Sequence, residues 1–405
     1  MAKVSSKRIL IVSGVFPPEP VTSAYLNYDL AVELSKSYDV TVLRPFPSRP
    51  AGLDYSYFKG LSNLPFKCVT LNSYRCPESS YIGRMRESFS FGRACKKFLL
   101  SHKGEFSYIY NASWHLFGYK IVSRTAVEQG IPYMVPIQDI YPESLYTGKN
   151  FPWLLRGLLN IFLKPIDRYY LSHAHKIRTI TMEMSDYLSK TRNIQKDKFL
   201  IVNNWQDESL LQYEKPVIHE KMTFSYVGSI NNHSNTELII KAFAKANIKN
   251  ARLMIYGKGN RYESCVRLVE SQGLSDRIVF DSVSKQKVSE VQANADFLVL
   301  ALPEGNAHFS LPSKITSYML SGRPIIASVD VDSASARIIK EAGAGYSVIP
   351  DNMSAFAEMF KRVSVLSYDE IERIGLNGRL YAQEYLSKKV NLSLVVNVIN
   401  NCVGV

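Results

Sequence analysis

The sequence predicts an α/β protein built from two doubly wound domains, each with a parallel sheet. Short buried strands alternate with helical stretches, as parallel sheets require, and this alternation starts twice, near Ile9 and again near Phe224. The chain of 405 residues is too long for one ordinary core and suits two domains of about 200 residues each. Ligands of open α/β sheets bind beyond the carboxyl ends of the strands, so functional residues are expected in the loops that follow strands.

The first series of elements begins with a strand at Ile9–Ser13, a proline-rich loop and a helix around Ala24–Ser35. The apolar run at Ile9–Ser13 is short and lacks a small-residue cleavage site, so we interpret it as a strand and not as a signal peptide. Further strands of this half are expected at Asp39–Leu43, Phe66–Leu71, Tyr108–Asn111, Tyr133–Pro136, Ile177–Thr181 and Leu200–Val202.

The second series predicts a strand at Phe224–Val227 that ends in Gly228 and Ser229, followed by a helix at about Thr236–Ala246. Its other strands are expected at Arg252–Tyr256, Ile278–Phe280, Phe297–Leu300, Pro324–Ala327 and Gly345–Val348. We therefore predict an N-terminal domain over residues 1–205 and a C-terminal domain over residues 206–380. The last helix is expected at about Asp369–Tyr385, and residues 381–405 form a C-terminal tail.

The charge of the chain is unevenly distributed. The formal net charge is +13, and residues 1–205 hold 27 Lys and Arg against 15 Asp and Glu, whereas residues 206–405 hold 22 against 21. Nucleic acid and an anionic membrane surface both attract such a basic half. No nucleic-acid-binding motif accompanies the charge, so a membrane surface is the favoured partner.

The five scattered cysteines indicate a reducing cytoplasm and no structural metal. No apolar run is long enough for a transmembrane helix.

One segment, residues 311–328, combines a helix start, a cation and a buried strand. Pro312 and Ser313 predict the start of a helix. Lys314 then stands in the first turn, where a cation gains nothing from the helix dipole and is better explained by a bound anion. Gly322 predicts the end of the helix, before the strand at Pro324–Ala327. An ordinary amphipathic helix that precedes a parallel strand is the alternative interpretation.

This segment resembles the nucleotide-sugar-binding region of family 4 glycosyltransferases, in the branch that builds bacterial surface polysaccharides. The resemblance implies a GT-B fold, in which two Rossmann-like domains face a central cleft, and a retaining reaction that needs no metal. It also implies that the tail, residues 381–405, packs back on the N-terminal domain. A second match is Gln138-Asp-Ile-Tyr-Pro-Glu-Ser144, which is similar to an Asp-Leu-Trp-Pro-Glu-Ser element of that branch. The family's pair of glutamates is absent, because Phe309 and Ser317 stand at those positions.

The resemblance implies a donor site for a nucleotide-diphosphate sugar in the C-terminal domain. Many relatives bring an Arg and a Lys to the diphosphate from the loop after the first strand, but here that loop carries Asn and His at residues 231–235. Charge neutralisation is therefore expected to depend on Lys314. The predicted donor-binding residues are Gly14, Gly228, Ser229, Lys258, Ser313 and Lys314; for Gly14 a tight turn, and for Lys258 a solvated turn lysine, are equally good explanations.

Two residues of the N-terminal domain are candidates for contact with the acceptor hydroxyl. Asp139 follows the strand Tyr133–Pro136, and its carboxylate could orient or deprotonate a hydroxyl. His115 follows the strand Tyr108–Asn111, and an imidazole there could take a proton, although a structural histidine among aromatic residues is the commoner case. Glu143 is interpreted mainly as a structural residue that caps the following helix.

Two stretches of the N-terminal half suit a membrane surface. Residues 81–100 interleave aromatic residues with cations, and the aromatic and apolar stretch 151–163 is too short to span a bilayer but could lie in its interface, anchored by Trp153. A core helix with a solvated basic face is the alternative for both. The residues expected to contact the acceptor or the membrane are Arg84, Arg86, Arg93, Lys96, Lys97 and Trp153.

These observations predict a cytoplasmic, peripherally membrane-bound glycosyltransferase. It would move a sugar, most plausibly UDP-linked, to a lipid-linked saccharide of a capsule or O-antigen pathway, without cofactor or metal and without nucleic acid as a partner. Two alternatives stay open: a sugar-nucleotide epimerase of the same architecture, and a non-catalytic subunit that binds a membrane or a nucleotide sugar.

Overall fold

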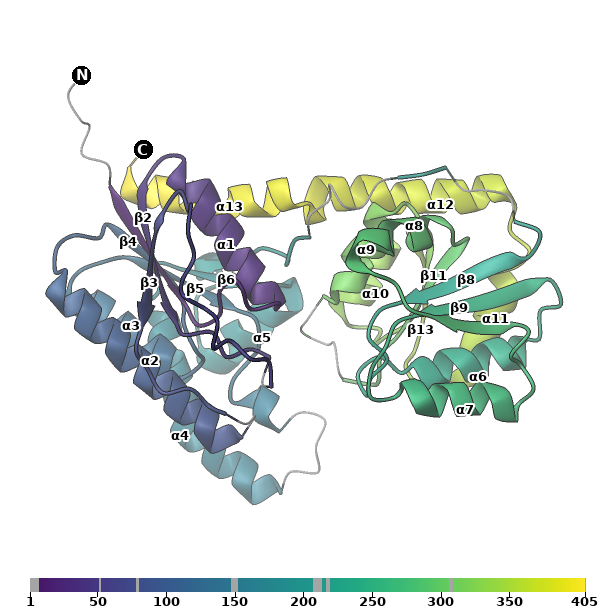
Figure 1. The fold of residues 1–405 in the computed structure, drawn as a ribbon, viewed down its shortest axis with the longest axis horizontal. Coiled ribbons are helices and arrows are strands. Elements are labelled where there is room, and N and C mark those ends of the chain that lie inside the picture. The colour runs from purple at the N-terminus through teal and green to yellow at the C-terminus, as the bar shows by residue number, and fades with distance from the viewer. Residues whose placement is uncertain are drawn as a thin grey trace. The chain divides into compact units, whose positions relative to one another are not determined.

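The computed structural model describes residues 7–50, 52–77, 80–146, 152–206, 213–215, 219–305, 309 and 311–404. These residues form two compact units (Figure 1). The first runs to Val202 and also includes the chain from Leu392 onward, and the second comprises Asn203–Asn391. The C-terminal segment that belongs to the first unit is therefore shorter than the predicted tail, 381–405.

The first unit contains a seven-stranded parallel sheet with the strand order β3-β2-β1-β4-β5-β6-β7. Its order reverses between β1 and β4, as in a doubly wound fold, and this switch point is where such sheets bind ligands. The strands are β1 (Arg8–Ser13), β2 (Asp39–Pro45), β3 (Lys67–Leu71), β4 (Tyr108–Ala112), β5 (Tyr133–Ile137), β6 (Lys176–Thr179) and β7 (Phe199–Ile201).

The helices of the first unit pack around this sheet, and Figure 1 shows α2, α3 and α4 side by side along one flank of it. They are α1 (Thr22–Ser35), α2 (Tyr81–Ser101), α3 (Phe117–Glu128), η1 (Glu143–Leu145), α4 (Trp153–Ser172), α5 (Met182–Arg192) and η2 (Lys196–Lys198). The end of α13 (Lys388–Val403) completes the unit. There the Tyr38 hydroxyl donates to Asn400 Oδ1 at 2.6 Å.

The second unit repeats the design with a six-stranded parallel sheet in the order β10-β9-β8-β11-β12-β13. Its switch point lies between β8 and β11. The strands are β8 (Met222–Val227), β9 (Ala251–Tyr256), β10 (Ile278–Asp281), β11 (Phe297–Ala301), β12 (Ile325–Ser328) and β13 (Gly345–Val348).

The helices of the second unit include α6 and α11, which cover the apolar core around Phe224, Phe243 and Phe360. Ser367 and Glu370 form a capping box that starts α12. The helices are α6 (Thr236–Ala246), α7 (Tyr262–Ser271), η4 (Lys285–Lys287), α8 (Val288–Ala293), α9 (Ser313–Leu320), α10 (Ala334–Glu341), α11 (Met353–Val363), α12 (Tyr368–Tyr381) and η5 (Ala382–Leu386).

The predicted fold class is confirmed: both domains are doubly wound α/β units, and every expected strand is present to within a residue or two of its predicted ends. The helix predicted at about Asp369–Tyr385 is confirmed, because α12 and the π-helical segment η5 together cover this range. The tail beyond it, for which no helix was predicted, forms α13.

Candidate functional site

In the second unit, Lys314 and Gly228 meet at the carboxyl end of β8. A Cβ atom on residue 228 would overlap Lys314 Cε and lie 2.7 Å from its Nζ atom. Gly228 also has φ +152°, a conformation that side chains rarely adopt. The glycine therefore provides the space in which the lysine lies, so the two predicted donor-binding residues form one local structure.

Lys314 is a half-buried cation. Its Nζ atom lies 5.4 Å from the centre of the Tyr226 ring, a favourable cation–π distance. Within the described part of the chain it has no hydrogen-bond or ion-pair partner. Burial lowers its pKa, because desolvation opposes the charged form. A half-buried ammonium group without a counter-anion, in the first turn of α9, is suited to binding an anion.

Tyr318 fixes the position of α9 relative to β8. Its buried hydroxyl accepts a hydrogen bond from the Val227 N–H at 3.0 Å and donates to the Val227 carbonyl at 3.1 Å. The predicted helix start at Pro312 and Ser313 and its end before Gly322 (φ +69°) are confirmed. The distance between Lys314 and the loop after β8 is thus set by the packing of α9.

The other predicted donor-binding residues surround this point less closely. Ser229 and Lys258 are exposed, and the Ser229 carbonyl accepts a bond from Tyr226 at 2.6 Å. The carbonyl of Ser313, also exposed, accepts from Gln206 Nε2 at 2.6 Å. Lys258 lies between Gly257 and Gly259, whose lack of side chains lets this loop pack against the backbone of Gly228 and Ile230. None of these contacts tests the predicted binding roles.

The departures from the family pattern have a structural counterpart. Ser317, at one glutamate position, is buried and exchanges hydrogen bonds with Gln292, at 2.9 and 3.1 Å. Phe309, at the other, is half-buried. Ser317 is therefore part of the packing between α8 and α9.

In the first unit, a cavity of about 840 Å³ opens at the carboxyl ends of β1, β4 and β5. This volume lies within the range of roughly 300–1,000 Å³ that is usual for small-molecule sites. Its lining includes the predicted residues Gly14, Arg84, His115 and Asp139. The switch point of the sheet thus brings together residues that are far apart in the sequence.

His115 forms part of an aromatic wall of the cavity. Its ring stacks on Tyr141, with centroids 4.5 Å apart, and meets Tyr119 edge-on at 5.3 Å. Burial lowers the pKa of His115, and the nearby carboxylate of Asp139 offsets this only in part. The neutral imidazole therefore predominates near pH 7, the form that can accept a proton. Asp139 is exposed at the cavity.

Gly14 serves a packing role that the sequence did not suggest. A Cβ atom on residue 14 would lie 3.0 Å from Cδ2 of Trp114, so the missing side chain makes room for the indole ring. The same indole ring lies 5.0 Å from the guanidinium carbon of Arg49. Gly14 shapes the cavity wall of the first unit, and its predicted contact with the donor stays a prediction.

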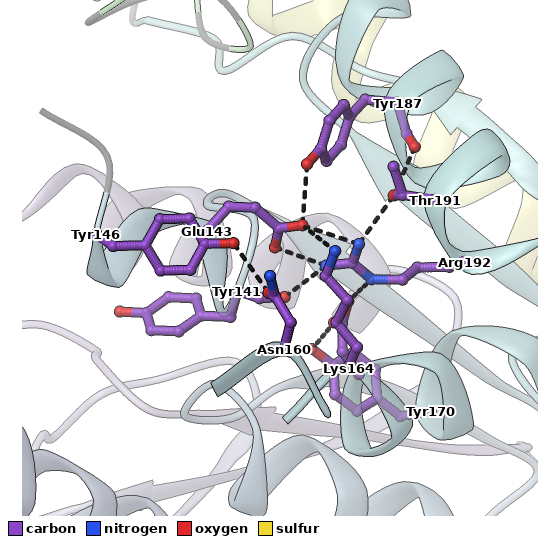
Figure 2. Close-up of polar contacts among 10 residues, drawn as sticks. Tyr141, Glu143, Tyr146, Asn160, Lys164, Tyr170, Tyr187, Thr191 and Arg192 are labelled. Carbon is purple, nitrogen blue, oxygen red and sulfur yellow. Dashed lines mark hydrogen bonds and ion pairs between the residues drawn. The ribbon is translucent and has the colours of Figure 1, made fainter. Parts of the chain in front are cut away.

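A buried charge cluster holds the loop that carries Tyr141 and Glu143 (Figure 2). Arg192 donates to both oxygens of Glu143, at 3.0 and 2.7 Å, to Asp167 at 2.6 Å and to the Tyr141 carbonyl at 2.8 Å. Lys164 and Tyr187 contact Glu143 at 3.3 and 2.9 Å. Glu143 is thus structural, as predicted, although it pairs with Arg192 on α5 and lies in η1 without a capping bond. The cluster positions Tyr141 and, through it, the His115 ring.

The pKa values within this cluster move in opposite directions. Burial opposes the charge of Glu143, but hydrogen bonds and attraction from Arg192 outweigh burial and lower its pKa. For Asp167 burial is the dominant effect and raises the pKa to about 6. The cluster is therefore sensitive to pH at Asp167.

The predicted membrane-facing residues occupy two helices. On α2, Arg84, Arg86, Arg93 and Lys97 are exposed and Lys96 is half-buried. On α4, the first half projects apolar side chains into solvent, while the second half is anchored by Leu163, Asp167, Tyr170 and Leu171. The exposed residues, with their exposed fractions, are Trp153 (78%), Leu154 (61%), Leu155 (47%), Leu158 (51%), Ile161 (66%) and Phe162 (69%). Phe151 of the predicted stretch lies outside the described residues.

Sequence reasoning missed Arg49, Glu87 and Trp114, which also line the cavity. Trp114 directly precedes the predicted site residue His115, and this position was the one sequence signal that could have identified it. Arg49 and Glu87 lie in an irregular loop and on α2, and only the fold brings them together.

Among the described residues, no group of three or more His, Cys, Asp or Glu could hold a metal ion, and no helix is long and apolar enough to cross a membrane.

Part of the second unit matches a known protein family. Residues 221–364 match the family model described as Glycosyl transferases group 1. A probable glycosyltransferase WbjE from Pseudomonas aeruginosa is 22% identical over 279 residues. This match covers 65% of the chain and 66% of the WbjE protein, slightly under two thirds of each.

Solved structures match along nearly the whole chain. HepE from Anabaena, in complex with UDP, has a TM-score of 0.69 at 11% identity, over 97% of this chain and 100% of that one. WaaG, a glycosyltransferase involved in lipopolysaccharide biosynthesis, has a TM-score of 0.64 at 14% identity, over 98% and 100%. The chain thus has the two-domain fold of GT-B glycosyltransferases, and residues 221–364 of its second unit match the group 1 glycosyltransferase model.

Proposed function

We propose that this chain, a glycosyltransferase by its group 1 domain and its fold, transfers a sugar from a UDP-sugar to a lipid-linked saccharide. The observation that carries the proposal is the ammonium group of Lys314, which has no ion-pair partner among the described residues and packs against the backbone of Gly228 at the switch point of the second sheet. A diphosphate placed there would neutralise the half-buried cation and receive free N–H groups of the first turn of α9. The UDP bound to HepE supports uridine as the nucleotide.

The cavity of the first unit is the proposed acceptor site. It combines aromatic walls with a few polar groups, the usual composition of a small-molecule site. His115 is neutral near pH 7 and Asp139 lies at the same cavity, so both are candidates to bind the acceptor hydroxyl and to take its proton. A proton acceptor is required because the hydroxyl oxygen forms the new glycosidic bond and must release its hydrogen.

A lipid-linked acceptor and a membrane surface are proposed from α4 and α2. Large apolar residues are exposed on successive turns of α4, with Trp153 at its start, and monomeric soluble proteins rarely expose such a patch without an interaction site. Exposed arginines on α2 would complement anionic lipid headgroups. We further propose peripheral attachment to the cytoplasmic face of a bacterial membrane and a role in capsule or O-antigen synthesis. The fold shared with WaaG, a glycosyltransferase involved in lipopolysaccharide biosynthesis, supports a role in surface-glycan synthesis.

The retaining stereochemistry and membership of family 4 are also part of this proposal. They are supported by the Pro312-Ser313-Lys314 helix start, which resembles that family and is formed in the structure. NMR measurement of the anomeric configuration of donor and product would test the stereochemistry, and an inverted product would refute it.

The donor site can be tested first, without knowledge of the acceptor. The purified chain is screened by thermal unfolding against UDP-, GDP- and dTDP-sugars, and the screen is repeated with Lys314→Ala and Lys258→Ala. We expect a UDP-sugar to raise the unfolding temperature of the wild type, in proportion to ln(1 + [L]/Kd), and Lys314→Ala to lose this effect. Stabilisation that is unchanged in Lys314→Ala would contradict the donor site. No stabilisation by any nucleotide sugar would favour a non-catalytic membrane-binding subunit.

A further inference from the structure

Two N–H donors in residues that line the first unit's cavity have no partner. Arg49 and Trp114 line the cavity, and Arg49 Nη1 and Trp114 Nε1 are both buried without a hydrogen bond among the described residues. A buried donor without a partner costs free energy comparable to a lost hydrogen bond, so such groups beside a cavity indicate a ligand. The two side chains are adjacent, since the Arg49 guanidinium carbon lies 5.0 Å from the Trp114 ring centre.

Arg49 is held rigidly by its other groups. Its backbone N–H donates to Glu19 Oε1 at 2.8 Å, its carbonyl accepts from the Tyr55 hydroxyl, and its Nη2 atom pairs with Glu87. Glu87 in turn accepts from the Cys76 N–H at 3.2 Å. The residue is only 8% exposed. The backbone groups and Nη2 are thus engaged, while Nη1 is a buried donor without a described partner in a residue that lines the cavity.

Trp114 is held in a comparable way. Its ring packs against Gly14, where a Cβ atom would lie 3.0 Å from the indole. Its backbone carbonyl, like that of His115, accepts from the Ser88 hydroxyl, at 3.3 and 2.6 Å. The next residue but one, Leu116, has φ +62°, a costly conformation for a side-chain-bearing residue. The turn after β4 thus maintains strain while it orients Trp114 and His115 toward one cavity.

The charge around the cavity favours an uncharged ligand. The lining contains two cations, Arg49 and Arg84, and two carboxylates, Glu87 and Asp139, while His115 is neutral. Glu87 already compensates the Arg49 charge at bonding distance. A free anion at Nη1 would compete with Glu87, whereas a hydroxyl or carbonyl oxygen would accept a hydrogen bond without disturbing the pair.

We propose that Arg49 Nη1 and Trp114 Nε1 donate hydrogen bonds to two oxygens of one uncharged sugar residue of the acceptor, and so determine acceptor specificity. The inference rests on the proposed function for its identification of this cavity as the acceptor site. A site built to hydrogen-bond a substrate hydroxyl rejects analogues that lack it, because its buried donors are then unpaired. Deoxy analogues should therefore bind more weakly than the parent sugar.

The indole N–H signals of the full chain report on this site directly. The chain has three tryptophans, so Trp114→Phe identifies the Trp114 signal by its loss from the ¹⁵N-correlated NMR spectrum. The wild type is titrated with methyl glycosides of neutral hexoses and 2-acetamido hexoses, their deoxy analogues, methyl glucuronide and inorganic phosphate. We expect at least one neutral glycoside to shift the Trp114 signal with saturation, and its deoxy analogue to bind less tightly.

Variants separate a binding role from a structural one. Arg49→Lys keeps the charge beside Glu87 but removes Nη1, and should weaken the glycoside affinity about tenfold, as loss of one hydrogen bond predicts. Trp114→Phe, followed by saturation-transfer NMR on the ligand, should weaken it to a similar extent. Arg124→Lys, in the surface pair with Glu128 on α3, is the matched control and should not change it. If Arg49→Lys does not fold, Trp114→Phe still decides.

Three results would overturn the subsite: no shift with any neutral glycoside, a larger shift with phosphate or glucuronide, or unchanged affinity in Trp114→Phe. UDP binding is measured on the same samples. If UDP stabilises the chain but no glycoside moves the Trp114 signal, the subsite is wrong and the donor site stands. If glycosides bind but UDP does not, the proposed transferase function is wrong and the sugar subsite stands.

Discussion

Lys314 and Gly228 depend on one another at the scale of single residues. The lysine stem occupies the space that any side chain on residue 228 would need, and the ammonium group lies over the face of Tyr226. The arrangement places a half-buried ammonium group at the end of β8, and it requires glycine both for space and for backbone conformation.

Gly228→Ala is therefore expected to displace the Lys314 side chain and to lower the affinity for a UDP-sugar by about tenfold or more. Titration calorimetry with UDP would measure the effect. Gly273→Ala is the matched control, because Gly273 also has a positive φ (+63°) but no atom within 4 Å of the added Cβ. The double variant Gly228→Ala with Lys314→Ala should lose little more than Lys314→Ala alone, and full additivity would argue against the coupling.

Asp167 gives a pH-dependent prediction. Its folded pKa of about 6 lies above the unfolded value of about 3.9, so the folded state holds this proton more tightly. The stability that it contributes is present below about pH 4 and is lost as the pH rises through about 6. The free energy of unfolding of the wild type minus that of Asp167→Asn should decrease between about pH 4 and about pH 6 and then level off.

Urea denaturation at several pH values would measure this difference. Asp186→Asn removes an exposed carboxylate that pairs with Lys196 at the surface and should show a much weaker pH dependence. An increase of the wild-type minus Asp167→Asn difference with pH would contradict the raised pKa.

The sequence could predict that Lys314 and Gly228 lie close together better than it could predict the contact between Arg49 and Trp114, for a physical reason. Lys314, its helix and the following strand form one continuous segment, and Gly228 is marked by the end of a predicted strand. Arg49 and Trp114 meet only because β1, β4 and the loop after β2 converge at the switch point. No local pattern records a contact between residues so far apart. The pairing of Glu143 with Arg192 on α5 was hidden for the same reason.

Helix α4 is the element in which apolar composition and exposure to solvent conflict most strongly. Its second half is fixed by buried residues and by the Asp167 and Arg192 pair, while its first half exposes apolar side chains. The central strands, such as β1 and β11, were predicted accurately because each is a short buried run. The exposure of α4 could not be predicted, because an apolar helical run has the same pattern in a protein core as in a membrane interface.

Leu158→Asp with Phe162→Asp should reduce binding to vesicles that contain anionic phosphatidylglycerol, because two large apolar groups no longer insert and two negative charges are added. Vesicle co-sedimentation would measure the loss, which we expect to be at least tenfold. Val365→Asp with Leu380→Asp makes the same change at exposed positions of the second unit (83% and 64% exposed) and serves as the control. Equal loss in both pairs would point to a general effect of charge and not to α4.

The whole molecule divides its charge between the two units in the way that two different ligands would require. Residues 1–205 carry a net charge of +12, from 27 Lys and Arg against 15 Asp and Glu, whereas residues 206–405 carry +1, from 22 against 21. A basic surface attracts an anionic bilayer over a distance set by salt, about 10 Å at 0.1 M. The proposed donor contact with Lys314 is short-range and involves a half-buried cation, so salt should screen it less.

Raising the salt concentration should therefore separate the two kinds of binding. We expect binding to anionic vesicles to fall steeply with added potassium chloride, and binding to vesicles without anionic lipid to be weak. The UDP-dependent rise in unfolding temperature should change only modestly with salt. Both quantities can be followed on one preparation, by co-sedimentation and by thermal unfolding. Binding of equal strength to neutral and anionic vesicles at every salt concentration would assign membrane attachment to α4 alone. Retention by a DNA oligonucleotide with the same salt dependence as vesicles would show that the basic half is a general polyanion-binding surface, because counterion release would then explain both interactions.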